Sequence, residues 1–193
     1  ALWHGHGEYR FAIDNVMDEV VLGGNFRQYV PRTFGSIFSD TLQRGSDSTY
    51  RVIKNSEWGA YIGLEKKLAN DRLKLNATAR FDKNQNFKLV PTFLVSSVYQ
   101  LNDKVTLRAA FSSAIRNPTL ADQYLYYKTA TNVTQLGNLN GFPHLADTAS
   151  YNAYRNDVNK DTTLLKYFDV DPIQPEKVQT FEVGARMTIA DRI

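Results

Sequence analysis

The sequence contains no cysteine, and this absence excludes several kinds of chemistry at once. Disulfide bonds, thiolate nucleophiles and zinc sites with sulfur ligands all require cysteine. No nucleophile–base arrangement, HExxH motif or phosphate-binding glycine loop is present either. We therefore expect a protein that is not an enzyme and that needs no metal ion or cofactor.

The sequence also lacks a strong charge of either sign and any long hydrophobic run. The 23 Lys and Arg against 20 Asp and Glu give a net charge of +3, too small a field to indicate a nucleic-acid partner. No run of about eighteen apolar residues exists, which excludes a transmembrane helix. A membrane stays open as the environment, because strands cross it with about 9–11 residues of alternating hydrophobicity.

The first ten residues, ALWHGHGEYR, lack the features of a secretory signal. No basic region precedes an apolar stretch there. We expect either a cytoplasmic protein or a chain that begins partway through a larger one.

What the sequence does contain is strict alternation of apolar and polar residues. In RLKLNATARFD, residues 72–82, every second residue from Leu73 to Phe81 is apolar, and the residues between them are polar or charged. Successive side chains of a strand point to opposite faces, so this segment is predicted to be a strand with one apolar face. The same period of two recurs in five further segments, the last two less regular: residues 57–68, 105–116, 180–189, 20–30 and 89–101.

Two details of the less regular strands can be predicted. The adjacent Gly23 and Gly24 suggest a bend or bulge in their strand. Pairing Leu101 with Val105 across a tight turn places Phe93, Val95, Tyr99 and Leu101 on the apolar side of theirs.

The connections between the predicted strands alternate in length. Three are short turns with Asn or Asp, which tolerate left-handed backbone: residues 69–72, 102–104 and 190–192. Three are longer: residues 31–56, 83–88 and 117–176. In an antiparallel meander the two kinds lie at opposite ends of the sheet, which is typical of outer-membrane barrels. Eleven residues at a rise of about 3.3 Å and a tilt of about 45° also span roughly 26 Å, close to the apolar band of such barrels.

The fold class predicted from these patterns is all-β, an antiparallel transmembrane β-barrel with long extracellular loops, to which a chain of this length supplies about six or seven strands. The residues expected to face lipid are Trp58, Ile62, Leu64, Leu73, Leu75, Phe81, Leu107, Phe111, Phe181 and Val183. The residues expected to face a watery lumen, where they line a transport path or pair with one another, are Arg72, Lys74, Arg80, Asp82, Arg108, Arg116, Glu182 and Arg186. The alternative is a soluble β-sheet carbohydrate-binding module, whose apolar face would lie in a protein core.

Four stretches carry a resemblance to a known family. FSSAIRNPTLADQYLYY (111–127) and IQPEKVQTFEVGAR (173–186), with ARFDKNQNF (79–87) and VYQLNDKVTLRAAFS (98–112), resemble segments of TonB-dependent outer-membrane receptors in the same order. One departure is Ile115, where the family's motif has an aromatic residue before the arginine.

The resemblance implies a barrel of about 22 strands with an N-terminal plug domain, in the outer membrane of a Gram-negative bacterium. It further implies import of a large nutrient, of the siderophore, glycan or peptide class, driven by the TonB energy-transducing complex. Residues 1–193 would then be part of the receptor barrel, with the plug domain and the remaining strands absent from this chain. The wording FGSIFSDT (34–41) resembles Bacteroidetes-type receptors, some of which work with a surface-exposed substrate-binding lipoprotein.

The sixty-residue connection 117–176 is rich in Tyr and Asn. Aromatic rings offer flat apolar faces and amides bond hydroxyl groups, which suits contact with a glycan or peptide. The alternative is that the tyrosines pack the loop on itself. The candidates for ligand contact are Tyr124, Tyr126, Tyr127, Tyr151, Tyr154 and Asn152.

Two weaker patterns suggest metal ligands. His4 and His6 would share a strand face, but Gly5 and Gly7 suggest a loop and no third ligand is near, so we expect no metal site. DVNKD (157–161) has the first ligand spacing of a calcium loop, yet it lacks the glycine and the final glutamate that the geometry needs.

Overall fold

The computed structural model describes residues 1–33, 37–38, 52–129 and 133–189. The chain forms two compact units. The first comprises Ala1–Pro31, Val52–Asn117 and Pro175–Ile193, and the second comprises Arg32–Arg51 and Pro118–Gln174.

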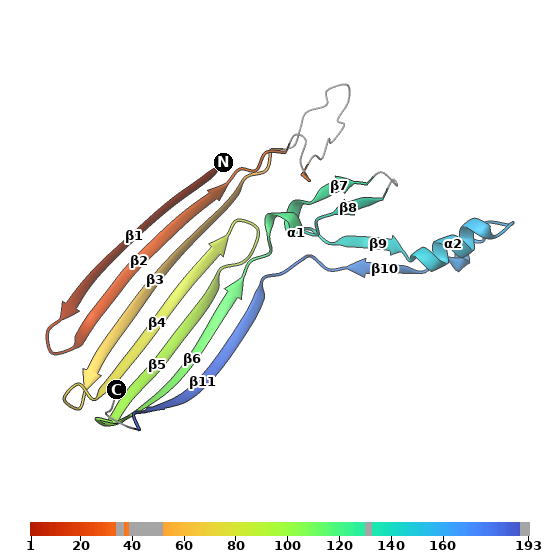
Figure 1. The fold of residues 1–193 in the computed structure, drawn as a ribbon. Helices are drawn as coiled ribbons and strands as arrows, with labels where there is room; N and C mark the ends of the chain where they lie inside the picture. Colours follow the sequence, from red (N-terminus) through yellow and green to blue (C-terminus); the bar gives the residue numbers. More distant parts are fainter. Residues whose placement is uncertain (34–36, 39–51, 130–132, 190–193) are drawn as a thin grey trace. The chain divides into compact units, whose positions relative to one another are not determined.

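The first unit is a single antiparallel sheet of seven strands (Figure 1). The strands lie in chain order, and the last of them pairs with β6 although residues 117–175 separate the two in the sequence. They are β1 (Leu2–Ile13), β2 (Met17–Tyr29), β3 (Asn55–Leu68), β4 (Leu73–Asn84), β5 (Val90–Asn102), β6 (Val105–Arg116) and β11 (Glu176–Met187). At 12–14 residues each, they are about twice as long as an average strand of a soluble protein.

The sorting of short and long connections is confirmed for two of the three predicted longer connections; the third, predicted at 83–88, is a short turn. The turns 14–16, 69–72 and 103–104 share one end of the sheet, and the connections 30–54 and 117–175 leave from the other (Figure 1). The β4–β5 turn, 85–89, is a short connection at that second end. The predicted turn 190–192 lies outside the described residues.

Turn chemistry explains the tight end of the sheet. Ala69, Asn70 and Asp71 all have left-handed φ angles, of 54°, 55° and 65°. In the β5–β6 turn the Asn102 carboxamide oxygen accepts from the backbone N–H groups of Lys104 and Val105, at 3.0 and 2.9 Å. These local bonds hold the chain reversal where the ladder ends.

Three predictions about strands are wrong. The N-terminal segment with Gly5 and Gly7 is not a loop but strand β1, paired with β2 along its length. Gly23 and Gly24 lie in regular pairing with both neighbouring strands; the irregularity of this hairpin falls between Phe11 and Ile13 instead.

The third concerns the β5–β6 turn. Val105 pairs with Asn102 rather than with Leu101, because the register shifts between Gln100 and Asn102. Hydrogen bonds from the backbone of Lys104 and Val105 to the Asn102 side chain favour this pairing. Here the local turn outweighs the pairing of one apolar residue with another.

The second unit contains short elements that the alternation did not predict. They are α1 (Leu120–Tyr124), β7 (Tyr126–Lys128), β8 (Thr134–Leu136), β9 (Phe142–Ala146), α2 (Thr148–Asn156), the 3-10 turn η1 (Thr162–Leu164) and β10 (Tyr167–Val170). Thr119 and Asp122 form a reciprocal capping box at α1, and Asp147 caps α2. Among the described residues, no helix has the length and hydrophobicity to cross a bilayer.

Candidate functional site

The register of the sheet sorts the side chains onto two faces. Residues paired directly across strands share a face, so the row Leu64, Ala77, Val95, Phe111 and Phe181 lies on one side. We call this side the apolar face and the opposite side the polar face. All residues predicted to face lipid lie on the apolar face.

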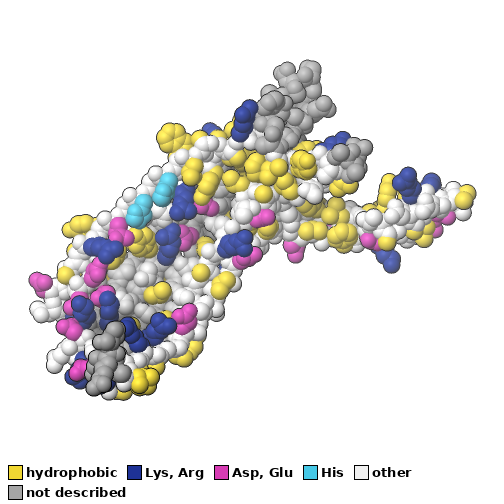
Figure 2. Space-filling view, viewed as in Figure 1, with side chains coloured by type: hydrophobic (Ala, Val, Ile, Leu, Met, Phe, Trp, Pro, Cys, Tyr) yellow, Lys and Arg dark blue, Asp and Glu magenta, His cyan; other side chains and the backbone are white. Residues whose placement is uncertain are grey.

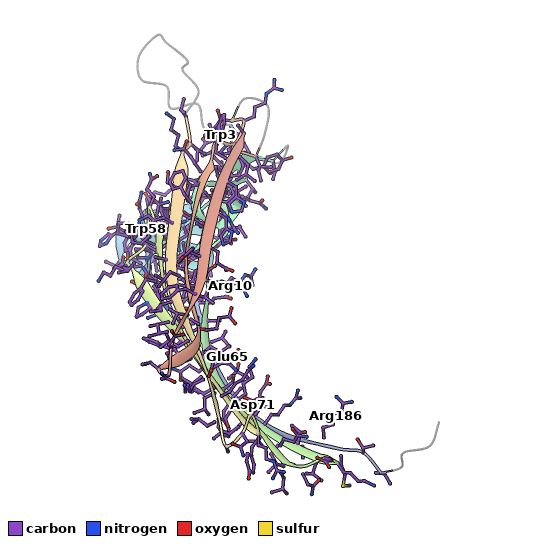
Figure 3. The ribbon with its side chains drawn as sticks, turned by 90° about the vertical axis from the view of Figure 1, so that its left-hand side faces the viewer. Trp3, Arg10, Trp58, Glu65, Asp71 and Arg186 are labelled. Carbon is purple, nitrogen blue, oxygen red and sulfur yellow. The ribbon has the colours of Figure 1, made fainter. Side chains whose placement is uncertain are left out.

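The residues predicted to face the lumen lie on the polar face, apart from one. Lys74, Arg80 and Asp82 of β4 share that face, as do four further residues: Arg108, Arg116, Glu182 and Arg186. Arg72 lies just outside β4, in the turn 69–72. In Figure 3, Trp58 projects to one side of the strands, and Arg10, Glu65 and Arg186 project to the other.

Large side chains of the apolar face are exposed. Trp58 is 47% exposed, Phe111 42% and Phe181 72%. Charged residues of this face lie at its two ends: Asp18 and Lys66 near the short turns, and Lys83 and Lys177 near the long connections. The middle of the face is therefore a broad uncharged apolar surface.

The polar face carries a connected network of charged and polar side chains. Figure 2 shows this face, on which His, Lys, Arg, Asp and Glu side chains gather. At its centre the Tyr61 hydroxyl donates to the Glu8 carboxylate, and His6 Nε2 lies 3.2 Å from the same hydroxyl. Arg10 donates to Glu8 at 2.7 Å and to Glu19 at 3.0 Å. The network thus joins three adjacent strands.

Arg80 extends the network to β4. Its guanidinium donates to both oxygens of Asp82, at 2.7 and 2.6 Å, and to the Asn25 side-chain oxygen at 2.7 Å. The same group lies 5.7 Å from the centre of the Tyr61 ring, within cation–π range. This arrangement holds the arginine flat on the sheet.

Glycines make the room that these large side chains need. A Cβ at Gly23 would lie 2.2 Å from the Tyr61 ring. A Cβ at Gly59 would lie 2.5 Å from Asp82 Oδ1 and 2.6 Å from an Arg80 nitrogen. The glycines therefore receive the side chains of neighbouring strands rather than bending the strand.

A second polar cluster lies where β3 and β4 meet the long connections. Asn84 Nδ2 donates to the side chains of Asn55, at 2.9 Å, and Glu57, at 2.8 Å. Asn117 Nδ2 reaches the same Glu57 oxygen at 3.3 Å. Asn55 and Asn84 are almost fully buried, at 1% and 2% exposed. This cluster was not predicted, because isolated asparagines give no periodic signal.

Other predicted lumen-facing charges also have neighbours on the polar face. Lys74 pairs with Glu65 at 2.7 Å, and Arg116 pairs with Glu176 at 3.5 Å. Arg108 lies over Gly184, where a Cβ would approach its Nε to 2.7 Å. Pairing among the charges is thus one role of this set.

The second unit distributes the predicted ligand-contact residues over two places. Tyr124 and Tyr126 line a cavity of about 210 Å³, together with Gln123, Asn140 and other residues of this unit. Tyr127, beyond them on β7, is exposed. The remaining three lie on α2: Tyr151, Asn152 and Tyr154. The two rings on α2 lie 6.4 Å apart, and neither lines the cavity.

The residues of the two possible metal patterns make other contacts in the structure. His6 belongs to the Tyr61 network, and no cluster of three His, Cys, Asp or Glu in the described part of the chain could hold a metal ion. Asp157 Oδ2 accepts from the Asp161 backbone N–H at 3.0 Å. Asp161 caps η1, and bonds from the Thr163 N–H and hydroxyl hold the pKa of the Asp161 carboxyl below its usual range.

The comparisons with known proteins agree with the long antiparallel strands of the sheet, because they identify a β-barrel family. The family model for the TonB dependent receptor-like β-barrel matches residues 3–192. The chain belongs to this family. The match covers both segments of the second unit and, apart from Leu2, all seven strands of the sheet.

A solved structure supports the barrel fold of this family member. The chain is similar to the siderophore receptor PirA from Pseudomonas aeruginosa, with a TM-score of 0.60 and 14% identity. The similarity covers 98% of this chain and 29% of the PirA chain. No curated protein matches the sequence. The Bacteroidetes-type subgroup stays a prediction.

Proposed function

We propose that the chain is part of the β-barrel of a TonB-dependent outer-membrane transporter that imports a large nutrient into the periplasm. One observation carries the proposal: long antiparallel strands place an exposed apolar face and a charged, networked face back to back. A soluble carbohydrate-binding module would need a protein layer over the apolar face. A barrel instead places that face against lipid and the polar network in a watery lumen.

The dimensions of the apolar face support this orientation. From Trp58 to Leu68 the strand β3 rises by ten steps, which at about 3.3 Å each and a tilt of about 45° spans roughly 23 Å. Aromatic side chains lie toward both ends of the face: Phe26 and Trp58 near the long connections, and Tyr99 near the short turns. Aromatic residues at these positions suit the two membrane interfaces.

The remaining parts of the proposal concern partners and cargo. The polar face would meet a plug domain elsewhere in the same receptor, and the short-turn end would face the periplasm and the TonB complex. Cargo of the siderophore, glycan or peptide class would enter from the long-connection end, where Tyr124 and Tyr126 are the first candidates for contact. A surface-exposed lipoprotein partner fits the same end. No catalytic step or nucleic acid is part of this function.

The test is the location and electrophoretic behaviour of the full-length gene product. We expect it in the outer-membrane fraction of a Gram-negative host, extractable only with detergent. Unheated samples should migrate faster than boiled ones, because a closed barrel resists unfolding by the detergent at room temperature. A soluble product without a heat-dependent shift would contradict the proposal.

A further inference from the structure

The apolar face is not uniform, because it contains a groove of about 470 Å³. Small residues form its floor: Ala77 of β4, Ser97 of β5 and Ala109 of β6. Larger side chains flank them, among them Leu64 and Phe111. The volume is in the range of small-molecule binding sites, about 300–1,000 Å³.

The register shows how the groove is built. Leu75 pairs with Ser97, and Ser97 pairs with Ala109, so these positions form a row across three strands. The next row toward the long connections holds Leu64, Ala77, Val95, Phe111 and Phe181. Ser97 and Ala109 in the first row and Ala77 in the second are smaller than the side chains around them, so together they leave a trough.

A cation lies at one end of this trough. Lys66 lines the groove and pairs directly with Leu75 in the same row. Its nearest described carboxylate, Asp18 Oδ2, is 3.9 Å away and already accepts from the Lys67 N–H at 2.6 Å. The Lys66 ammonium can therefore serve an additional anionic oxygen, and it does so near the short-turn end of the face, at the membrane interface of the proposed barrel.

These observations limit what can fill the groove. If the apolar face borders lipid, an empty trough would forfeit dispersion contacts along its whole lining, and water would find almost no polar partners there. A hydrocarbon chain can fill it, and a phosphate attached to that chain would reach Lys66. We propose that the groove binds one glycerophospholipid, with an acyl chain over Ala77, Ser97 and Ala109 and its phosphate on Lys66. This inference rests on the lipid-facing orientation proposed above.

The test measures phospholipid bound to the purified full-length receptor. The receptor and its variants are extracted in dodecyl maltoside, mixed with dioleoyl phosphatidylglycerol, and examined by native mass spectrometry. Ala109→Phe fills the groove, and Lys66→Gln removes the cation. We expect the unaltered receptor to retain one phospholipid and each variant to reduce the bound fraction at least fivefold.

Two matched controls separate the groove from general effects on the surface. Lys67→Gln removes the neighbouring charge on the polar face, and Ala79→Phe adds the same ring on the apolar face outside the groove. Both should retain phospholipid as the unaltered receptor does. Equal retention by all variants, or replacement of phospholipid by detergent alone, would overturn the proposal.

The heat-dependent gel shift, measured on every sample, distinguishes the two proposals. A receptor that shows the shift but binds no phospholipid contradicts only the lipid site. A receptor without the shift contradicts the barrel itself and, with it, the lipid site. A defined receptor dimer in place of bound phospholipid would identify the groove as a contact between copies and overturn the lipid assignment.

Discussion

At the scale of single residues, large side chains of the polar face lie over glycines of the neighbouring strand. Tyr61 lies over Gly23, the Arg80–Asp82 pair lies over Gly59, and Arg108 lies over Gly184. Glycine in a strand interior normally weakens the strand, because its backbone loses more conformational entropy on folding and it has no side chain to pack. Here the missing Cβ is what lets a charged or aromatic group lie flat and reach its hydrogen-bond partners on adjacent strands.

The first prediction compares two glycines on the same face of β3. Gly59→Ala should destabilise the folded barrel by about 1–3 kcal/mol, because its Cβ would push apart Arg80 and Asp82. Gly63→Ala should be neutral or stabilise by up to about 1 kcal/mol, because its nearest atom would be 3.5 Å away. Urea unfolding of the reconstituted receptor measures both. Equal effects of the two changes would show that the close fit around Gly59 is not important.

At the scale of elements, depth along a strand decides what a substitution costs. Leu75 is near the start of β4, two positions from Leu73, and pairs with Lys66, so it lies toward the short-turn interface. Ile62 lies near the middle of β3 and pairs with Ala79 on the apolar face. The penalty for a charge facing lipid is largest at the middle of the bilayer and falls toward its interfaces.

The second prediction uses this dependence on depth. Ile62→Arg should cost about 2–4 kcal/mol in the reconstituted barrel, because the guanidinium would face hydrocarbon. Thr78→Arg, which lies at the same level but on the polar face, should stay within about 0.5 kcal/mol. Folding into phospholipid vesicles, followed by urea titration, measures the difference. A larger penalty for Thr78→Arg than for Ile62→Arg would reverse the assignment of the faces.

At the scale of the whole molecule, the chain separates a sheet from an inserted unit. Residues 118–174 contribute no strand to the seven-stranded sheet in the described structure. The strands that flank them are paired up to the point of insertion, since Arg116 pairs with Glu176. The sheet can therefore form without residues 118–174, which matches the usual division between scaffold and binding loops.

The third prediction tests that division. Replacing residues 118–174 with a short Gly-Ser linker in the full-length receptor should leave outer-membrane assembly and the heat-dependent gel shift intact. Deleting the β3–β4 hairpin, residues 55–84, should abolish both, because it removes ladder partners of β2 and β5. Loss of the gel shift in the linker variant would show that residues 118–174 are needed for the barrel to form.

The sequence by itself determined the strands with a clean period of two, the places of the two longest connections, and the membership of each side chain of those strands in one of two faces. These features are local: alternation assigns faces as soon as a segment is a strand, and Asn or Asp sets a turn through its own backbone. The shared face of Leu75 and Phe111 follows from such patterns alone.

Only the tertiary structure decided which polar groups meet. Glu8 and Tyr61, or Asn25 and Arg80, are far apart in the chain and come together through strand register. A slip of one residue would turn either partner to the opposite face, so no local pattern can specify these pairs. For the same reason the sequence did not predict the role of Gly23, which depends on the Tyr61 ring of the next strand. Nor did it predict strand β1, whose glycines are part of a strand because they pair with β2.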